Sequence, residues 1–302
     1  MADHAHPIAT YSPDMESDIG LARETRRRKF MQKSALVALA LILVLAFGFP
    51  LYFMVTSSFK AEEEVLVTPI HWLPHNFQGF AQYQNAFDIQ PIGRYFFNSF
   101  LMASIDVVVT VFFSALAGYG FAKFNFRFKQ FYFLFVLSTL MIPFQILVVP
   151  LYVQVRTLGW ADSYAGLIIP GIMNAFGVFM MRQFVYGIPD ELLDAARIDG
   201  ASEPRIFMQI VFPLLAPASA SLAIIIFLFS WNNFLWPLII IQSPDLYTLP
   251  VGMQAFANPY QARPQWAAGM AASVMATLPV AVLVLFFQRY FVQGMVLSGL
   301  KG

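Results

Sequence analysis

Long stretches without any charged residue constrain this chain more than any other feature of its sequence. Between Arg94 and Lys123 only Asp106 is charged, and five other stretches carry no charge at all: 34–59, 130–155, 163–181, 206–244 (apolar centre 218–242) and 264–288. An α-helix needs about 20 apolar residues to cross the hydrocarbon core of a bilayer, so each stretch can span it. Because the stretches are continuous, they favour helices over the short alternating strands of a membrane barrel. The sequence predicts an all-α integral membrane protein with six transmembrane helices.

The order of these stretches predicts how the chain is organised. Residues 1–29 contain few large apolar side chains and are expected to form a disordered cytoplasmic tail. The basic run "RETRRRK" at its end is expected to touch anionic lipid and to anchor the first span, not to bind nucleic acid. The remaining predicted segments are a first transmembrane helix at 30–60, an outer loop at 61–93, and a core with five transmembrane helices at 94–302.

The positions of lysine and arginine predict the orientation. With the N-terminus inside, fourteen of the eighteen fall on inner segments: Arg23, Arg26, Arg27, Arg28, Lys29, Lys33, Lys123, Arg127, Lys129, Arg182, Arg197, Arg205, Arg289 and Lys301. The other four fall on outer segments: Lys60, Arg94, Arg156 and Arg263. Since cytoplasmic loops carry an excess of these residues, both termini are expected to be cytoplasmic.

Several kinds of chemistry are excluded by residues that the sequence lacks. There is no cysteine, so disulfides, thiolate metal sites and cysteine nucleophiles are excluded. His71 and His75 are four residues apart, but Pro74 interrupts any helix between them and no third ligand is near, so no metal site is predicted. No G-x-x-x-x-G-K-[ST] loop occurs and no nucleophile–base pair is evident, so the chain is not expected to be an enzyme or to hydrolyse ATP.

A short charged segment interrupts the apolar chain between the fourth and fifth spans. It reads "IPDELLDAARIDGASEPR" at 188–205. Pro189 and the acidic pair after it are helix-start signals, and Gly200 is expected to end the helix in a left-handed C-cap. Ser202 is expected to cap a second helix. The segment therefore predicts two short helices at the cytoplasmic face.

Two interpretations of this segment compete. An amphipathic helix lying on the lipid surface favours lysine and arginine on its polar face, whereas this helix is acidic at its start. Ala195, Ala196 and Gly200 would let another protein surface approach closely. These residue types favour a docking site for a cytoplasmic partner protein.

The segment also resembles a known family. "DAARIDGASEPRIFMQIVFP" is similar to the EAA signature of ABC-importer permeases: it has Asp194-Ala195-Ala196, Gly200, Ile210 and Phe212-Pro213 at the family's spacing, with Asp for Glu and Phe for Leu. "NSFLMAS", "AGYGFAKF", "YTLPVGMQAF" and "QRYFVQGMVLSGLKG" resemble the carbohydrate branch, typified by a maltose-transporter permease. The resemblance covers about residues 30–302.

The resemblance implies a function, partners and a location. The chain would be a permease subunit of the type I ABC importer fold in a bacterial or archaeal cytoplasmic membrane, carrying a carbohydrate or polyol derivative by alternating access. Its partners would be a homologous permease, two ATP-binding subunits that hold ATP and Mg²⁺, and an extracytoplasmic solute-binding protein. A coupling helix at about 190–200 would contact the ATPase through Glu191, Asp194, Ala195, Ala196 and Gly200. Asn258, Tyr260 and Arg263 would contact the solute-binding protein, unless they form an ordinary outer turn.

Polar and aromatic residues inside the spans are candidates for the substrate path, because sugars are bound by aromatic faces and by amide or hydroxyl groups. The candidates are Phe229, Asn232, Asn233, Trp236, Asp106 and Gln145. Of the two asparagines, one is expected to line the path and the other to bond between helices, although both could be structural. Asp106 could bind a sugar hydroxyl or pair with a partner subunit, and Pro143 and Pro150 around Gln145 suggest a broken helix or a kinked packing helix.

A self-sufficient secondary transporter or channel is the alternative function. It would require an internal repeat and usually more charge within the membrane. No convincing repeat relates the two halves of the sequence, so the importer permease is favoured.

Overall fold

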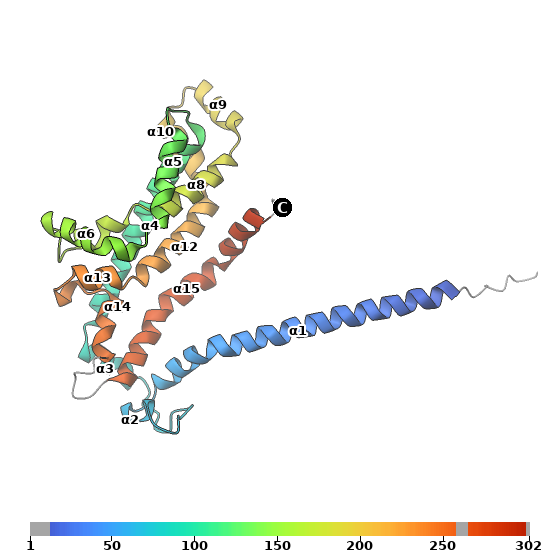
Figure 1. Ribbon diagram of the computed structural model, residues 1–302. Coiled ribbons are helices and arrows are strands. Elements are labelled where there is room, and N and C mark those ends of the chain that lie inside the picture. The colour runs from blue at the N-terminus through green and yellow to red at the C-terminus, as the bar shows by residue number, and fades with distance from the viewer. Residues whose placement is uncertain (1–12, 258–264, 300–302) are drawn as a thin grey trace, which may run out of the picture. The chain divides into compact units, whose positions relative to one another are not determined.

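The computed structural model describes residues 13–257 and 265–299, with side chains for 29–257 and 265–286 (Figure 1). All regular elements of these described residues are helical, as predicted. In chain order they are α1 (Pro13–Ser57), α2 (Glu62–Val65), α3 (Ala81–Ile89), α4 (Ile92–Lys123), α5 (Lys129–Ser138), η1 (Thr139–Met141), α6 (Phe144–Thr157), α7 (Tyr164–Ile168), η2 (Ile169–Gly171), α8 (Ala175–Tyr186), α9 (Asp190–Ile198), α10 (Glu203–Ile206), η3 (Phe207–Val211), α11 (Phe212–Leu214), α12 (Ala216–Trp231), α13 (Leu235–Ile240), η4 (Pro244–Leu246), α14 (Leu249–Gly252), η5 (Met253–Ala257) and α15 (Trp266–Gly299).

The chain divides into two compact units, residues 1–56 and 57–302. The first unit consists of α1 up to Thr56. This helix begins at Pro13, within the segment predicted as a tail, and its part from Lys29 onward is long and apolar enough to cross a membrane. The second unit contains all the other helices.

Three helices and three bent helix pairs have the length and composition of membrane spans. The helices are Lys29–Ser57, Ile92–Lys123 and Trp266–Phe286. The pairs are Lys129–Met141 with Phe144–Thr157, bent by 101°, Tyr164–Gly171 with Ala175–Tyr186, bent by 45°, and Glu203–Leu214 with Ala216–Trp231, bent by 75°. The described residues therefore hold three candidate spans, or six if each bent pair crosses once.

Proline and a capping residue account for two of the three bends. Pro143 separates η1 from α6, so of the two alternatives for this position the structure has the broken helix and not the kinked one. A proline lacks the N–H that would continue a helix. Asn174 precedes α8, and its Oδ1 accepts a hydrogen bond from the Gly177 backbone N–H at 3.0 Å, which is an N-cap.

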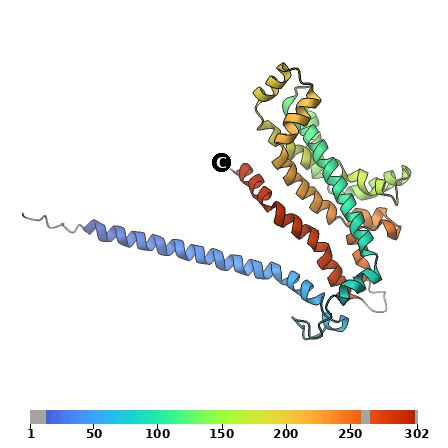
Figure 2. The same cartoon turned by 180° about the vertical axis from the view of Figure 1, so that it is seen from behind.

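Helix α4 lies at the centre of the second unit. It packs along α8 and α12, and α12 in turn packs on α15; Figures 1 and 2 show these helices side by side from opposite directions. Three clusters of buried apolar side chains make up the core, and α4 contributes to each of them, for example through Tyr95, Met102 and Ala115. The position of α4 therefore sets the positions of its neighbours.

The α4–α8 contact depends on small residues. A Cβ added at Gly118 would lie 2.7 Å from the Arg182 backbone nitrogen, and one added at Gly177 would lie 2.3 Å from the Ser114 Oγ. Glycine at these two positions lets the helix backbones approach closely, as is common between helices in membranes.

Candidate functional site

The charged segment between the fourth and fifth spans forms α9, which lies at the end of α4 remote from α3 (Figure 1). Its first turn is held by Lys123, the last residue of α4. The Lys123 Nζ donates to the Ile188 carbonyl oxygen at 2.5 Å and to the Asp190 Oδ1 at 2.7 Å. The Lys123 side chain is only 7 % exposed, whereas that of Asp190 is 75 % exposed. This ammonium group lowers the pKa of the Asp190 carboxyl.

A second set of polar contacts holds the other end of α9. Arg197 donates from NH1 to the Asp194 Oδ1 at 2.7 Å and from Nε to the Glu203 Oε1 at 2.8 Å. Glu203, in α10, also accepts a hydrogen bond from the Tyr119 hydroxyl of α4 at 2.7 Å. The two carboxylates raise the pKa of Arg197, which stays protonated. Both ends of α9 are thus connected to α4.

The turn after α9 has the predicted glycine. Gly200 has φ +85°, its N–H donates to the Arg197 carbonyl, and the Ala201 N–H donates to the Ala196 carbonyl, each at 3.0 Å. This is a Schellman C-cap and confirms the predicted left-handed end. The predicted cap at Ser202 is wrong in one respect: Ser202 precedes α10, but its side chain makes no capping hydrogen bond.

Helix α9 has one buried side and one exposed side. Leu193 is 1 % exposed, and Ala196 packs against the core cluster that contains it. Besides Asp190, Arg197 and Asp199, the exposed residues of α9 and of the turn after it are Glu191, Leu192, Asp194, Ala195, Ile198 and Gly200. We call these six residues the α9 face. It contains four of the five residues predicted to contact an ATPase, while Ala196 faces the core instead.

The predicted substrate-path residues do not converge on one site. Phe229 is 73 % exposed and Gln145 is exposed on α6. Trp236 is buried, and its Nε1 donates to the Gly166 carbonyl at 3.0 Å. Trp236 therefore stabilises the contact between α13 and α7.

Asp106 is buried between α4 and α12. Its Oδ2 accepts a hydrogen bond from the Ser230 hydroxyl at 2.5 Å, and its Oδ1 has no hydrogen-bond partner among the described residues. The side chain faces the protein interior, where a membrane carboxylate is expected to lie. The contact it makes joins two helices of this chain.

The two adjacent asparagines lie at a helix end. The apolar stretch 218–242 predicts one continuous span, but α12 ends at Trp231 and α13 begins at Leu235. The Asn232 Nδ2 donates to the Leu228 carbonyl at 2.8 Å, and this carbonyl also accepts from the Asn232 backbone N–H at 3.2 Å, so the side chain adds a second hydrogen bond at the last turn. Asn232 also lines a cavity of about 470 Å³, whose other lining residues are Trp231, Leu249, Pro250, Met253, Ser273, Ala276, Thr277 and Val280.

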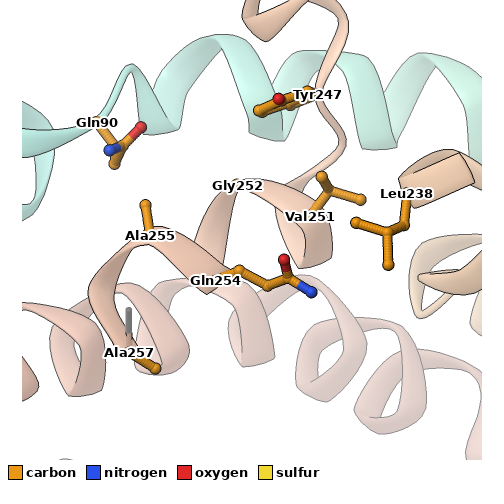
Figure 3. Close-up of a pocket in the computed structure, with 8 residues that line it drawn as sticks. All are labelled: Gln90, Leu238, Tyr247, Val251, Gly252, Gln254, Ala255 and Ala257. Atoms are coloured by element: carbon orange, nitrogen blue, oxygen red, sulfur yellow. The ribbon is translucent and has the colours of Figure 1, made fainter. Parts of the chain in front are cut away.

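A second cavity, of about 550 Å³, lies on α14 and η5 (Figure 3). Its lining residues are Gln90, Leu238, Tyr247, Val251, Gly252, Gln254, Ala255 and Ala257. We call it the outer cavity. Its polar residues were not predicted from the sequence. The one signal was "YTLPVGMQAF", which supplies most of the lining but was noted only for its family resemblance.

Two other groups of predicted residues add little to these sites. Asn258, Tyr260 and Arg263 lie outside the described residues. His71 and His75 stack with ring centroids 4.0 Å apart, and the described residues contain no cluster of three His, Asp or Glu that could hold a metal ion. Lys60, next to this pair, is fully buried and donates to the His71 carbonyl at 2.5 Å; burial lowers its pKa.

Comparisons with known proteins identify relatives over most of the chain. The family described as "Binding-protein-dependent transport system inner membrane component" matches residues 110–297. The arabinooligosaccharides transport system permease protein AraQ of Bacillus subtilis is 37 % identical over 270 residues, which cover 89 % of this chain and 95 % of AraQ. The sn-glycerol-3-phosphate transport system permease protein UgpE of Yersinia enterocolitica is 34 % identical over 258 residues, covering 84 % of this chain and 92 % of UgpE.

A solved structure has a similar fold. It is the crystal structure of a bacterial ABC transporter involved in the import of the acidic polysaccharide alginate. One of its chains matches with a TM-score of 0.76 and 20 % identity, over 95 % of this chain and 100 % of that chain.

Proposed function

The chain belongs to the family of binding-protein-dependent transport system inner membrane components, and we infer that it is the permease subunit of an ATP-driven (ABC) carbohydrate importer. It is a multi-pass membrane protein with a translocation role and no enzymatic one. The observation that carries the proposal is the geometry of α9: an exposed face at one end of the unit, with polar contacts that connect it to α4.

The α9 face is proposed as the docking site for a separate ATP-binding subunit. It combines carboxylates of Glu191 and Asp194 with the apolar side chains of Leu192, Ala195 and Ile198, the last of which is 87 % exposed. A mixed acidic and apolar surface suits a protein partner better than anionic lipid. ATP and Mg²⁺ would bind on that partner, since this sequence has no P-loop.

Movement of the ATPase would reach the membrane through α4 and α10. Lys123 connects the start of α9 to α4, and Glu203 connects its end to both α4 and α10. If two ATPases close, α9 and α4 would move as one rigid body, which is how small displacements at an interface are carried over a distance. A second, homologous permease subunit would complete the pathway.

The orientation that fits this proposal has both termini and α9 in the cytoplasm. The excess of lysine and arginine on the predicted inner segments supports it. Six spans result if each bent pair crosses the membrane once. The outer side would then hold α2, α3 and α14, and residues 258–263 would be placed to contact a solute-binding protein.

The proposed substrate path passes Asn232. After it binds the Leu228 carbonyl, its amide still has one N–H and the oxygen free for a sugar hydroxyl. Ser273 and Thr277 each donate to a carbonyl of their own helix, so their oxygens can still accept in the same cavity. Of the other predicted path residues, Asp106 and Trp236 are proposed to hold the walls of the path in position.

The experiment that tests the proposal uses Ala195→Trp. Ala195 is an exposed, central residue of the α9 face, so the indole would leave the buried side of α9 unchanged and obstruct docking. We expect the tagged wild-type chain, purified from its native host in mild detergent, to carry ATPase activity that Ala195→Trp loses. The control is Gln130→Trp, an exposed position in the first turn of α5 near the same end of α4. Equal ATPase activity in both variants would contradict docking on α9.

A further inference from the structure

The outer cavity has no part in the function derived so far. The end of α3 at Gln90 meets there three segments that are more than 140 positions away in the sequence, namely α13 at Leu238, the turn before α14 at Tyr247, and η5 at Gln254. Figure 3 shows Gln90 at one end of the cavity and Leu238 with Val251 at the other. Its volume of about 550 Å³ lies within the usual range for small-molecule sites.

The lining carries the groups that recognise sugars. Tyr247 supplies an aromatic ring, while its hydroxyl donates to the Gln242 carbonyl at 3.5 Å, and two glutamines supply amides. The Gln90 Oε1 accepts from the Tyr95 hydroxyl at 3.0 Å, which leaves its two amide N–H groups available. The Gln254 side chain is exposed and makes no hydrogen bond to a described residue. None of the eight lining residues is charged.

The floor of the cavity is fixed by buried residues. A Cβ at Gly252 would lie 2.1 Å from the ring of Tyr95, which is only 2 % exposed. Glycine at this position therefore lets α14 lie directly on the tyrosine that also orients Gln90. The turn that carries Tyr247 is held too, because Asn98 Nδ2 donates to the carbonyls of Asp245 and Tyr247, each at 2.9 Å.

The cavity lies at the end of α4 that is opposite to α9. Gln90 lies two residues before the start of α4, whereas α9 is bound to Lys123 at the other end of the same helix. In the orientation proposed above, this places the cavity on the outer side of the membrane. The assignment of a side rests on the proposed function, but the cavity itself does not.

We propose that the outer cavity is a binding subsite for a neutral saccharide, which it receives before the sugar enters the membrane pathway. The sugar ring packs on Tyr247, and hydroxyl groups accept from Gln90 and exchange hydrogen bonds with Gln254. Because the lining residues hold no cation, the subsite binds a neutral oligosaccharide in preference to a phosphorylated or uronic acid substrate.

The absence of cysteine in this chain allows a direct test. Ala255→Cys places one thiol in the cavity wall. The variant is purified with its partner subunits in lipid nanodiscs, where reagents reach both sides, and the rate of thiol modification of this chain is measured by mass spectrometry. Three neutral probes are used, arabinotriose, maltotriose and raffinose, with sn-glycerol 3-phosphate for comparison. Gln84→Cys, at an exposed position of α3 outside the cavity, is the control.

We expect at least one neutral probe to slow the modification of Ala255→Cys and to leave Gln84→Cys unaffected. Adding Gln254→Leu is expected to raise the probe concentration needed for protection about fivefold, as the loss of one hydrogen bond predicts. Tyr247→Leu should weaken protection similarly, and Tyr247→Phe, which keeps the ring, should not.

Three results would overturn the subsite: no protection by any neutral probe, protection unaffected by Gln254→Leu, or better protection by sn-glycerol 3-phosphate. Each is separable from a failure of the proposed function. ATPase co-purification through α9 is scored on the same preparations and does not depend on the outer cavity.

Discussion

Lys123 makes the most consequential single contact in the proposed coupling site. Its nearly buried ammonium group binds both the Ile188 carbonyl and the Asp190 carboxylate, so it fixes the start of α9 to the end of α4. We expect Lys123→Met to leave the complex assembled but to lower the stimulation of ATP hydrolysis by loaded binding protein at least about fivefold, because the substitution removes two hydrogen bonds and the loss of one is already expected to cost about that factor. The measurement is the ratio of stimulated to basal ATPase rate in nanodiscs. Lys123→Arg is the control and should retain most of the ratio.

The same pair predicts a defined pH dependence. The pKa of Asp190 is lowered by Lys123, so its contribution is present above the pKa of the unfolded chain and is lost as the pH falls through the folded value. The unfolded value is about 3.9, so the difference between wild type and Lys123→Met should be constant from about pH 5 to pH 8. A difference that vanished within this range would show that another group controls the contact.

Asp106 shows what a single residue in the sequence can and cannot predict. A lone carboxylate in an apolar stretch must face the interior, and burial against Ser230 agrees with that expectation. The partner could not be predicted, because Ser230 lies 124 positions away and serine is common in membrane helices. Sequence position alone does not distinguish a contact within one chain from a contact with substrate.

Helices α4 and α8 pack closely because α4 has a glycine where the backbone of α8 approaches it. Gly118 and Gly120 are two residues apart on α4, yet a Cβ at Gly118 would meet the backbone of Arg182, and one at Gly120 would meet nothing within 4 Å. We expect Gly118→Ala to destabilise the protein by about 1–3 kcal/mol, because the helices must separate or shift. Gly120→Ala is the matched control and should be neutral or stabilising by up to about 1 kcal/mol, because alanine favours the helix.

The comparison is made by thermal unfolding of the two variants and the wild type in the same detergent. Gly118→Ala should unfold at a lower temperature than the wild type, and Gly120→Ala at the same or a higher one. If both variants shifted equally, the close approach of α8 at Gly118 would be refuted.

Elements defined by local chemistry were predictable, and those defined by distant contacts were not. Pro189 and Gly200 delimit α9 because a proline and a left-handed glycine act on their own backbone. Pro143 breaks its helix for the same reason. The end of α12 at Trp231 was not predicted, because the apolar residues resume at Phe234 after Asn232 and Asn233 and continue to Ile241, so that the whole stretch has the length of one span. The outer cavity could not be predicted from the sequence either, because Gln90 and Tyr247 come together only through the packing of α14 on α4.

Helix α4 is longer than the hydrocarbon core of a membrane is thick. Its 32 residues correspond to roughly 48 Å at 1.5 Å per residue, which exceeds the hydrocarbon thickness of about 30 Å. If α4 crosses a membrane, as its length and composition allow, the segments at its two ends lie on opposite sides. Gln84 precedes this helix and Asn125 follows it, and both are exposed.

These two positions give a test of orientation that depends on no partner protein. In the cysteine-free chain, Gln84→Cys should react in intact cells with a thiol reagent that cannot cross membranes, because the α3 side faces outward. Asn125→Cys should react only after the cells are permeabilised. The excess of lysine and arginine on the predicted inner segments favours a cytoplasmic location for the α9 side. The reverse pattern would place α9 outside, where it could not meet a cytoplasmic ATPase. Reaction at both positions in intact cells would mean that α4 does not cross the membrane, and the arrangement of α9 and the outer cavity on opposite sides would have to be abandoned.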